Sequence, residues 1–274
     1  VMSMVPIGAS IKDGFDAGHG LPFDSQGMKE RYPGIFFSQF SGAELMAERW
    51  NLSREDLDKF ALSSHQKAAA AVEGKYFDRE ILPVQAKNAE GKKDMVLNDE
   101  GIRFDASLEA LSGLNPVTEG GVITAGNASQ ITDGAAALMI CNDVGLKKVK
   151  ADPRARIVGI SVVGDDPILM LGGPIPASHK VLKETKLNID DIDLYEVNEA
   201  FAPVPLSWAI ELKANIEKLN VNGGAMALGH PLGATGAKLM TTLLHELERT
   251  NGKYGLQAIC EGGGTANATI IERI

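Results

Sequence analysis

The sequence is poor in the features that mark secreted, membrane-spanning or nucleic-acid-binding proteins. It holds two cysteines that lie far apart, Cys141 and Cys260, and these cannot build a disulfide framework. It contains no apolar run of about 18 residues, the length that a membrane span needs. Its formal net charge is -9, which disfavours non-specific contact with phosphate backbones. We therefore expect a protein of a reducing compartment, the cytoplasm, that binds neither membrane nor nucleic acid.

Other familiar signals are also missing. The first ten residues lack the basic and apolar segments of a signal peptide, and because Val1 replaces an initiator methionine we expect the chain to begin inside a longer protein. Glycine is abundant, with 30 residues, but no G-x-G-x-x-G follows a predicted strand and no G-x-x-x-x-G-K-[ST] occurs. The signal for a nucleotide-binding loop is therefore weak, and we expect no metal site and no bound cofactor. Four histidines lack any motif context and are interpreted as surface or structural: His19, His65, His179 and His245.

The first part of the chain has a mixed pattern. Residues 1–40 are rich in glycine, proline and aromatics and predict a packed loop, because the phenylalanines at 36, 37 and 40 need burial. Two helices follow over 41–50 and 53–74, the second beginning with a capping box of Ser53 and Asp56 and ending at Gly74. A short strand over 81–85 and a solvated hairpin over 87–100 complete this part.

From residue 122 onward, predicted strands and helices alternate, which favours an α/β fold with helices on the faces of a mixed or parallel sheet. Pro203 and Pro205 fall near the start of one helix, where proline is tolerated. The predicted strands cover 122–125, 135–141, 155–163, 194–197, 219–221, 256–260 and 268–272. The predicted helices cover 177–186, 200–212 and 235–249.

Two glycine-rich loops near the C-terminus each carry one side chain that can transfer a proton. His230 lies between Gly229 and Pro231, and Cys260 ends a predicted strand directly before Glu261 and three glycines. Glycines let backbone N–H groups approach a developing oxyanion, which favours a catalytic site. Both residues also have structural interpretations, as a turn histidine bonded to backbone and as a small buried hydrophobe. Helix capping is an equally simple interpretation of Asn198, Glu199 and Ser129.

These segments together resemble the thiolases along the whole chain. The matching motifs are Thr124-Ala125-Gly126-Asn127-Ala128-Ser129, Asn198-Glu199-Ala200-Phe201, Gly229-His230-Pro231-Leu232-Gly233, Cys260-Glu261-Gly262-Gly263-Gly264 and, near the start, Met2-Ser3-Met4. The Cys260 motif and the glycine-rich segment near Gly172 favour the degradative, β-oxidation type. The resemblance implies an α/β, thiolase-like fold with layers in the order α-β-α-β-α. It divides the chain into a loop domain over 1–121, the end of the N-terminal half over 122–152 and the complete C-terminal half over 153–274.

The resemblance also implies a reaction, in which an acyl-CoA C-acyltransferase cleaves 3-oxoacyl-CoA with coenzyme A or runs the reverse Claisen condensation of acetyl-CoA. His230 matches the base that activates the nucleophile, and it also supports an oxyanion hole. Cys260 matches the second cysteine, which moves the proton at the α-carbon, and nearby dipoles are expected to bring its pKa close to neutrality. Asn198 matches the residue that holds a water in one oxyanion hole. The backbone N–H of Gly262 would complete the other hole.

Coenzyme A enters this reaction as a substrate, so the implied partners are CoA and acyl-CoA and no separate cofactor is implied. Ser129 matches a contact to the pantetheine arm. Arg103 and Ser107 match contacts to the CoA nucleotide, and Ala200 is placed with the CoA-binding residues. The resemblance further implies a homo-oligomer for the complete protein.

One part of the chemistry is not matched by this sequence. Thiolases carry their acyl-accepting cysteine before the Met-Ser motif at which this sequence starts. Cys141 lies in the apolar run 135–141, which predicts a buried and unreactive thiol in a strand. We therefore expect the chain alone to be inactive. The alternatives are a CoA-binding fragment without turnover and a decarboxylating condensing enzyme, but such enzymes use His or Asn where Cys260 stands.

Overall fold

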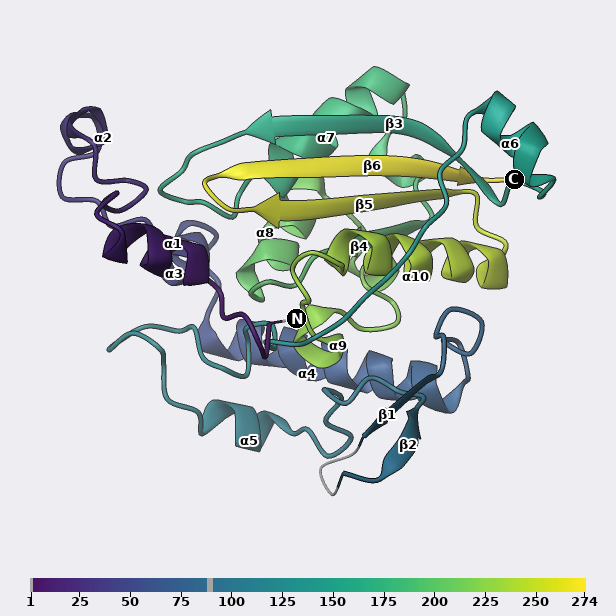
Figure 1. The fold of residues 1–274 in the computed structure, drawn as a ribbon, viewed down its shortest axis with the longest axis horizontal. Coiled ribbons are helices and arrows are strands. Elements are labelled where there is room, and N and C mark those ends of the chain that lie inside the picture. The colour runs from purple at the N-terminus through teal and green to yellow at the C-terminus, as the bar shows by residue number, and fades with distance from the viewer. Residues whose placement is uncertain (1, 88–90) are drawn as a thin grey trace.

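The computed structural model describes residues 2–87 and 91–274 (Figure 1). Its centre is a four-stranded sheet in the order β3-β6-β5-β4. Strands β4 and β5 are parallel, whereas β6 pairs antiparallel with both β5 and β3. The predicted α/β class with a mixed sheet is therefore confirmed. The strands are β3 (Ala155–Gly164), β4 (Leu194–Val197), β5 (Tyr254–Glu261) and β6 (Thr265–Arg273).

Helices cover both faces of this sheet because its strands alternate between two apolar surfaces. Leu256 of β5 belongs to the large core that includes Trp208, whereas a side chain at Gly255 would meet Leu243 on the opposite face. Helix α7 (Pro174–Thr185) packs on β3 and β6, with α8 (Pro203–Leu212) against it, and α10 (Thr235–Thr250) packs on β4 and β5. These elements form three consecutive layers of the five that the resemblance implies (Figure 1).

The helix pair of the first part is placed as predicted. Helix α3 (Gln39–Arg49) is followed by α4 (Arg54–Glu73), and the Ser53–Asp56 capping box and the Gly74 C-cap are both formed. Helix α4 contributes Leu57 and Ala61 to the main core. It also packs against α5 (Leu108–Ser112) and the short helix α9 (Ala225–Leu228). Helix α4 thus joins the first part of the chain to the loop that carries His230.

The first forty residues differ from the prediction of a packed loop. They form two short helices, α1 (Ala9–Asp16) and α2 (Gln26–Arg31), neither of which has a buried residue. Phe36 is 83% exposed, so the expected burial of that ring is wrong. The hairpin is confirmed, with β1 (Val84–Lys87) antiparallel to β2 (Lys93–Val96), although β1 begins three residues later than predicted. Its turn at 88–90 lies outside the described residues.

Three of the predicted strands do not form. Segments 122–125 and 219–221 make only single bridges, Thr124 to Pro116 and Leu219 to Tyr195. Residues 135–141 have no regular structure, Ile140 is 74% exposed and Cys141 is exposed, so the predicted buried thiol is wrong. An apolar run becomes a strand only when a neighbouring strand completes its hydrogen bonds, and in the described part of the chain none lies beside this run.

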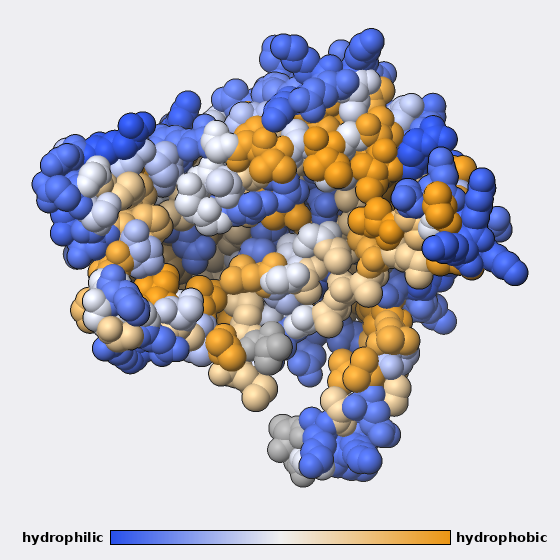
Figure 2. All heavy atoms as spheres, turned by 45° about the horizontal axis from the view of Figure 1, so that its top comes forward, coloured by the Kyte–Doolittle hydropathy of each residue, from blue (hydrophilic) through white to orange (hydrophobic). Residues whose placement is uncertain are grey.

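The remaining elements are short. Helix α6 (Asp143–Val149) precedes β3, and two 3₁₀ turns, η1 (Ile189–Asp191) and η2 (Ile216–Lys218), flank β4 and α8. The face of β3 that points away from α7 is apolar, with Ile160 56% and Val162 61% exposed. Figure 2 shows hydrophobic residues gathered below the hydrophilic top edge and towards the right side of the molecule.

Candidate active site

The parallel pairing of β4 and β5 brings Asn198 next to the strand that carries Cys260. The backbone N–H of Asn198 donates to the carbonyl of Ala258 at 3.0 Å, which continues the ladder one residue beyond β4. The side chains of Asn198 and Cys260 are 1% and 7% exposed. The Asn198 amide lies near enough to the Cys260 thiol to lower the pKa of that thiol. The sheet therefore assembles two of the predicted site residues at the carboxyl ends of neighbouring strands.

His230 reaches this pair from the loop after α9. Gly229 supplies a left-handed turn with φ of 78°, where a Cβ would also collide with Thr132, and the His230 N–H then donates to the carbonyl of Gln130 at 3.1 Å. The His230 Nε2 atom lies 3.2 Å from Nδ2 of Asn198. The structure thus joins His230, Asn198 and Cys260 in one cluster, as the motifs predict.

The hydrogen bonds around His230 are compatible with the tautomer that carries its proton on Nδ1. Thr235 donates its hydroxyl proton to the carbonyl of Pro231 at 3.0 Å, and the same oxygen lies 2.6 Å from Nδ1 of His230. Because that hydroxyl has one proton, the Thr235 oxygen accepts from Nδ1–H. The Nε2 atom then holds a lone pair, which accepts from the Asn198 amide. His230 is therefore oriented with its basic nitrogen towards Asn198.

The surroundings of His230 keep its ring neutral. Burial, followed by the positive charge of Lys238, lowers the pKa of His230 to about 4. Desolvation penalises the imidazolium form, and a nearby cation adds to that penalty. At neutral pH the ring is thus unprotonated at Nε2, where its lone pair is available.

The protonation state of Cys260 differs from the expectation. Burial raises the pKa of Cys260 to about 12, and the Glu261 carboxylate also raises it, while its own backbone N–H and Asn198 only partly offset the effect. The prediction that local dipoles bring this pKa close to neutrality is wrong, because desolvation of the thiolate outweighs them. Cys260 is therefore a protonated thiol in this structure.

The turn between β5 and β6 is built from glycines. Gly263 and Gly264 have φ values of 78° and 80°, a region that side-chain-bearing residues rarely adopt. Gly262 is exposed, and its carbonyl accepts from the Thr265 hydroxyl at 3.2 Å. The predicted role of its N–H in an oxyanion hole stays a prediction.

Glu199 is a structural clamp rather than a simple helix cap. Its carboxylate is 1% exposed and accepts from the Ser64 hydroxyl at 2.7 Å, the Asn220 amide at 2.9 Å and the Met226 N–H at 3.1 Å. A Cβ at Gly224 would lie 2.2 Å from this carboxyl group, so only glycine fits there. Glu199 therefore ties α4 and α9 to the end of β4 and so fixes the approach of the His230 loop.

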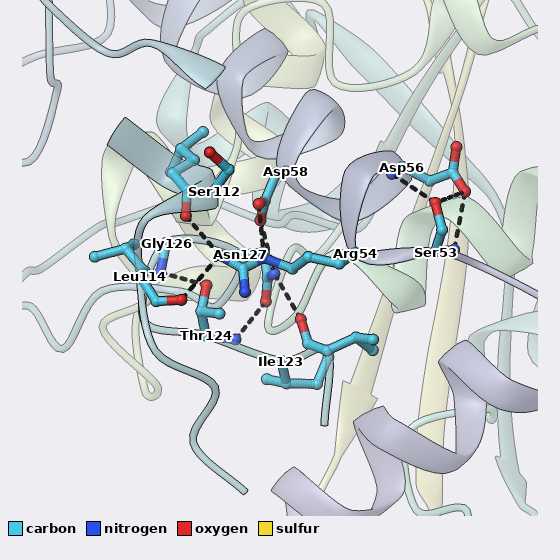
Figure 3. A network of polar contacts seen from close by, with 12 residues as sticks. Ser53, Arg54, Asp56, Asp58, Ser112, Leu114, Ile123, Thr124, Gly126 and Asn127 are labelled. Carbon is cyan, nitrogen blue, oxygen red and sulfur yellow. Dashed lines mark hydrogen bonds and ion pairs between the residues drawn. The ribbon is translucent and has the colours of Figure 1, made fainter. Parts of the chain in front are cut away.

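The loop that carries Ser129 is held by a buried polar network (Figure 3). The Asn127 side chain accepts from the N–H of Thr124 at 2.9 Å and donates to Asp58 at 3.0 Å, and Asp58 accepts from Arg54 at 2.6 Å. Arg54 also donates to the carbonyls of Leu111 and Leu114 (Figure 3). One carboxylate on α4 thus fixes both α5 and the loop.

The residues predicted to contact CoA lie in three different segments of the chain. The Ser129 N–H donates to the carbonyl of Ala200 at 2.9 Å, which places the Ser129 loop beside the segment that follows Asn198. Arg103 is exposed, and its N–H donates to Nδ1 of His65 at 3.1 Å. Ser107 caps α5 by accepting from the N–H of Ala110. Neither Arg103 nor Ser107 hydrogen-bonds to the catalytic cluster among the described residues, and their predicted roles stay predictions.

Thr235 is a site residue that the motifs did not single out. It lies five positions after His230, within the same glycine-rich segment, and it begins α10. Its spacing from His230 is the signal that could have identified it, because a helix start after a loop directs its first side chains back towards that loop. Ser64, on α4, carries no comparable sequence signal.

Membrane spans and metal clusters are both absent from residues 2–87 and 91–274. No helix there is both long and apolar enough to cross a bilayer. No group of three or more His, Cys, Asp or Glu side chains in the same ranges is arranged to hold a metal ion.

Comparison with known proteins gives a consistent family assignment. Residues 24–144 match the family model described as thiolase, N-terminal domain, and residues 151–273 match thiolase, C-terminal domain. The steroid 3-ketoacyl-CoA thiolase FadA6 of Mycobacterium tuberculosis is 50% identical over 274 residues, all of this chain and 66% of that protein. The boundaries at residues 121 and 152 predicted from the sequence stay predictions.

Solved structures show the same fold. The acetyl-CoA acetyltransferase of Bacillus anthracis superposes with a TM-score of 0.84 at 41% identity, over 88% of this chain and 61% of that one. Human mitochondrial 3-ketoacyl-CoA thiolase in complex with CoA gives 0.78 at 41% identity, over 85% and 58%. The chain thus spans 58% to 66% of the length of these relatives. With both family models matched and the predicted thiolase-like fold present, the chain belongs to the thiolase family.

Proposed function

We propose that this chain belongs to an acyl-CoA C-acyltransferase that cleaves 3-oxoacyl-CoA with coenzyme A or runs the reverse Claisen condensation of acetyl-CoA. The observation that carries the proposal is the joined cluster of His230, Asn198 and Cys260, in which a neutral base, an amide and a thiol meet at the ends of two parallel strands. Relatives named as thiolases support this reaction, as does the human thiolase that was solved with CoA.

The chemistry assigns a separate role to each member of the cluster. In cleavage, a thiolate adds to the 3-oxo carbon, the bond between the α- and β-carbons breaks, and an acetyl-CoA enolate leaves. The Cys260 thiol gives its proton to the α-carbon of that enolate. Asn198 stabilises the oxyanion through the water that it is predicted to hold, and Nε2 of His230, which carries a lone pair, accepts the proton of the incoming thiol. A resting thiol at Cys260 suits this direction, because the α-carbon must gain a proton.

The acyl group needs a carrier other than the two thiols of this chain. Cys260 has the proton-transfer role and cannot hold the acyl group at the same time. Cys141 is exposed and lies in an irregular segment outside the His230, Asn198 and Cys260 cluster. We therefore propose that the 274-residue chain by itself does not turn over, and that a homo-oligomeric complete protein does. A reducing compartment such as the cytoplasm fits, because Cys260 must stay a free thiol.

A chimera tests this proposal. The part of FadA6 that this chain does not cover is joined to residues 1–274, and thiolysis of acetoacetyl-CoA is measured together with acyl adducts by mass spectrometry. The chimera is expected to turn over, Cys260→Ala is expected to lose several powers of ten in rate, and Cys141→Ala is the matched control that keeps the rate. Near-normal thiolysis by Cys260→Ala, or turnover by the unfused chain, would refute the assignment.

A further inference from the structure

Gln130 comes directly after Ser129, and the proposed reaction gives its side chain no role. Its amide nitrogen Nε2 donates to two backbone carbonyls, that of Gly101 at 2.8 Å and that of Met226 at 2.7 Å. Both protons of the amide are therefore used. The two acceptors lie far apart in the sequence, so this one side chain joins residues 101–103, the Gly101 segment, to helix α9.

Helix α9 holds the His230 loop through several contacts. It has only four residues, and carbonyls at the end of a helix have no partner within it. The Met226 carbonyl accepts from Gln130, and the Leu228 carbonyl accepts from the Lys238 ammonium group. The N–H of His230 donates to the backbone carbonyl of Gln130, which a substitution such as Gln130→Met leaves in place. The position of His230 therefore depends little on the Gln130 side chain.

The Gly101 segment depends on that side chain more directly. Ile102 is buried and packs into the small core beneath α9. The N–H of Arg103 donates to Nδ1 of His65 at 3.1 Å. Just before the segment, Asp99 forms an ion pair with α10 at 3.5 Å between the charged atoms. Gln130 thus supplies the hydrogen bond at the start of the segment, and His65 supplies the one at its end.

The two ends of this arrangement suit different parts of coenzyme A. Arg103 is exposed, and a guanidinium group binds phosphate oxygens well. The nucleotide part of CoA carries phosphates, whereas pantetheine carries none. Ser129, the predicted pantetheine contact, is fixed by its N–H to the carbonyl of Ala200 at 2.9 Å. Because Ser129 and Gln130 are adjacent, the Gln130 side chain sets the spacing between Ser129 and Arg103.

We propose that Gln130 is a positioning residue for coenzyme A, whose side-chain amide holds the Gly101 segment at the distance from Ser129 at which Arg103 meets the nucleotide phosphates. Gln130 acts on the ligand through this segment and does not touch the reacting atoms. The statement about CoA rests on the proposed function. The anchoring of the segment is a property of the chain itself, so the two are tested separately.

Amide hydrogen exchange of the full chain without ligand tests the anchoring. Gln130→Met keeps the side-chain volume but removes the donor, and the Arg103 N–H is expected to exchange roughly fivefold faster, about the effect of one hydrogen bond. The His230 N–H is expected to keep its rate. Gln257→Met, the matched control, removes a buried amide that donates to another backbone carbonyl and is expected to leave Arg103 unchanged. Unchanged Arg103 exchange in Gln130→Met, or equal acceleration in Gln257→Met, overturns the proposal.

Kinetics of the chimera test the statement about CoA. Gln130→Met is expected to raise KM for acetoacetyl-CoA roughly tenfold with kcat nearly unchanged, and to leave KM for acetoacetyl-pantetheine as it was. In an Arg103→Ala background the same substitution is expected to have no further effect. Equal changes for the two substrates, or additive changes in the double variant, overturn the proposal. A chimera without any turnover refutes the proposed function instead, and amide exchange still decides the anchoring.

A second substitution disturbs the same contact from the other side. A Cβ at Gly101 would lie 2.7 Å from the carbonyl of Ala227 and 2.8 Å from Oε1 of Gln130, so Gly101→Ala must displace the segment. If Gln130→Met does not fold, Gly101→Ala is expected to show the same difference between the two substrates. Gly113→Ala is its control, because a Cβ there meets only atoms at 3.6 Å. An unchanged KM for acetoacetyl-CoA in Gly101→Ala also overturns the proposal.

Discussion

The neutral state of His230 makes the fold sensitive to acid in a way that can be measured. Its pKa falls from an ordinary 6.5 to about 4 in the folded chain, chiefly through burial and then through Lys238. Between pH 6.5 and about pH 4, His230 binds a proton in the unfolded chain but stays neutral in the folded chain. The contribution of neutral His230 to the free energy of unfolding is therefore present above pH 6.5 and is lost as pH falls towards 4. At about 1.36 kcal/mol for each pH unit, the loss is roughly 3 kcal/mol.

Urea unfolding of wild type and His230→Gln at about pH 7 and about pH 4 isolates this effect, because other titrating groups are common to both proteins. Wild type is expected to lose roughly 3 kcal/mol more than the variant between the two conditions. His179→Gln is the matched control, since it removes an imidazole that is exposed to solvent. An equal loss of stability in wild type and His230→Gln would show that the folded chain accepts the proton freely and would refute the reasoning.

Two further predictions concern the buried polar network at Asp58 and the apolar face of β3. Asp58→Ala leaves Arg54 and Asn127 without their buried carboxylate and is expected to cost roughly 3 to 5 kcal/mol in the free energy of unfolding. The control Glu55→Ala, which breaks an exposed ion pair on α4, is expected to cost at most about 1 kcal/mol. Equal losses in the two variants would contradict the role of the buried network. The apolar face of β3 is expected to cause self-association, so Ile160→Lys should lower static light scattering at a given concentration, and unchanged scattering would show that this face is not the cause.

Local sequence rules identified most of the elements around the site. The capping box at Ser53 sets the start of α4, because it satisfies N–H groups that no other part of the helix can reach. Apolar patterning identified β3, β4, β5 and β6 for a similar reason, since one or both faces of each strand are covered. The run 135–141 has an equally apolar composition but no neighbouring strand in the described part of the chain, and composition alone does not supply one.

The motifs likewise placed His230, Asn198 and Cys260 at loop and strand ends, because those positions depend on glycine and on strand length, which are local properties. Their electrostatic state depended on the tertiary structure. The pKa of Cys260 is raised to about 12, and that of His230 is lowered, by burial against segments far away in the sequence. Desolvation is set by everything that surrounds a group in space. For this reason the sequence alone determined which side chains meet, and only the folded chain decided which of them carry a proton.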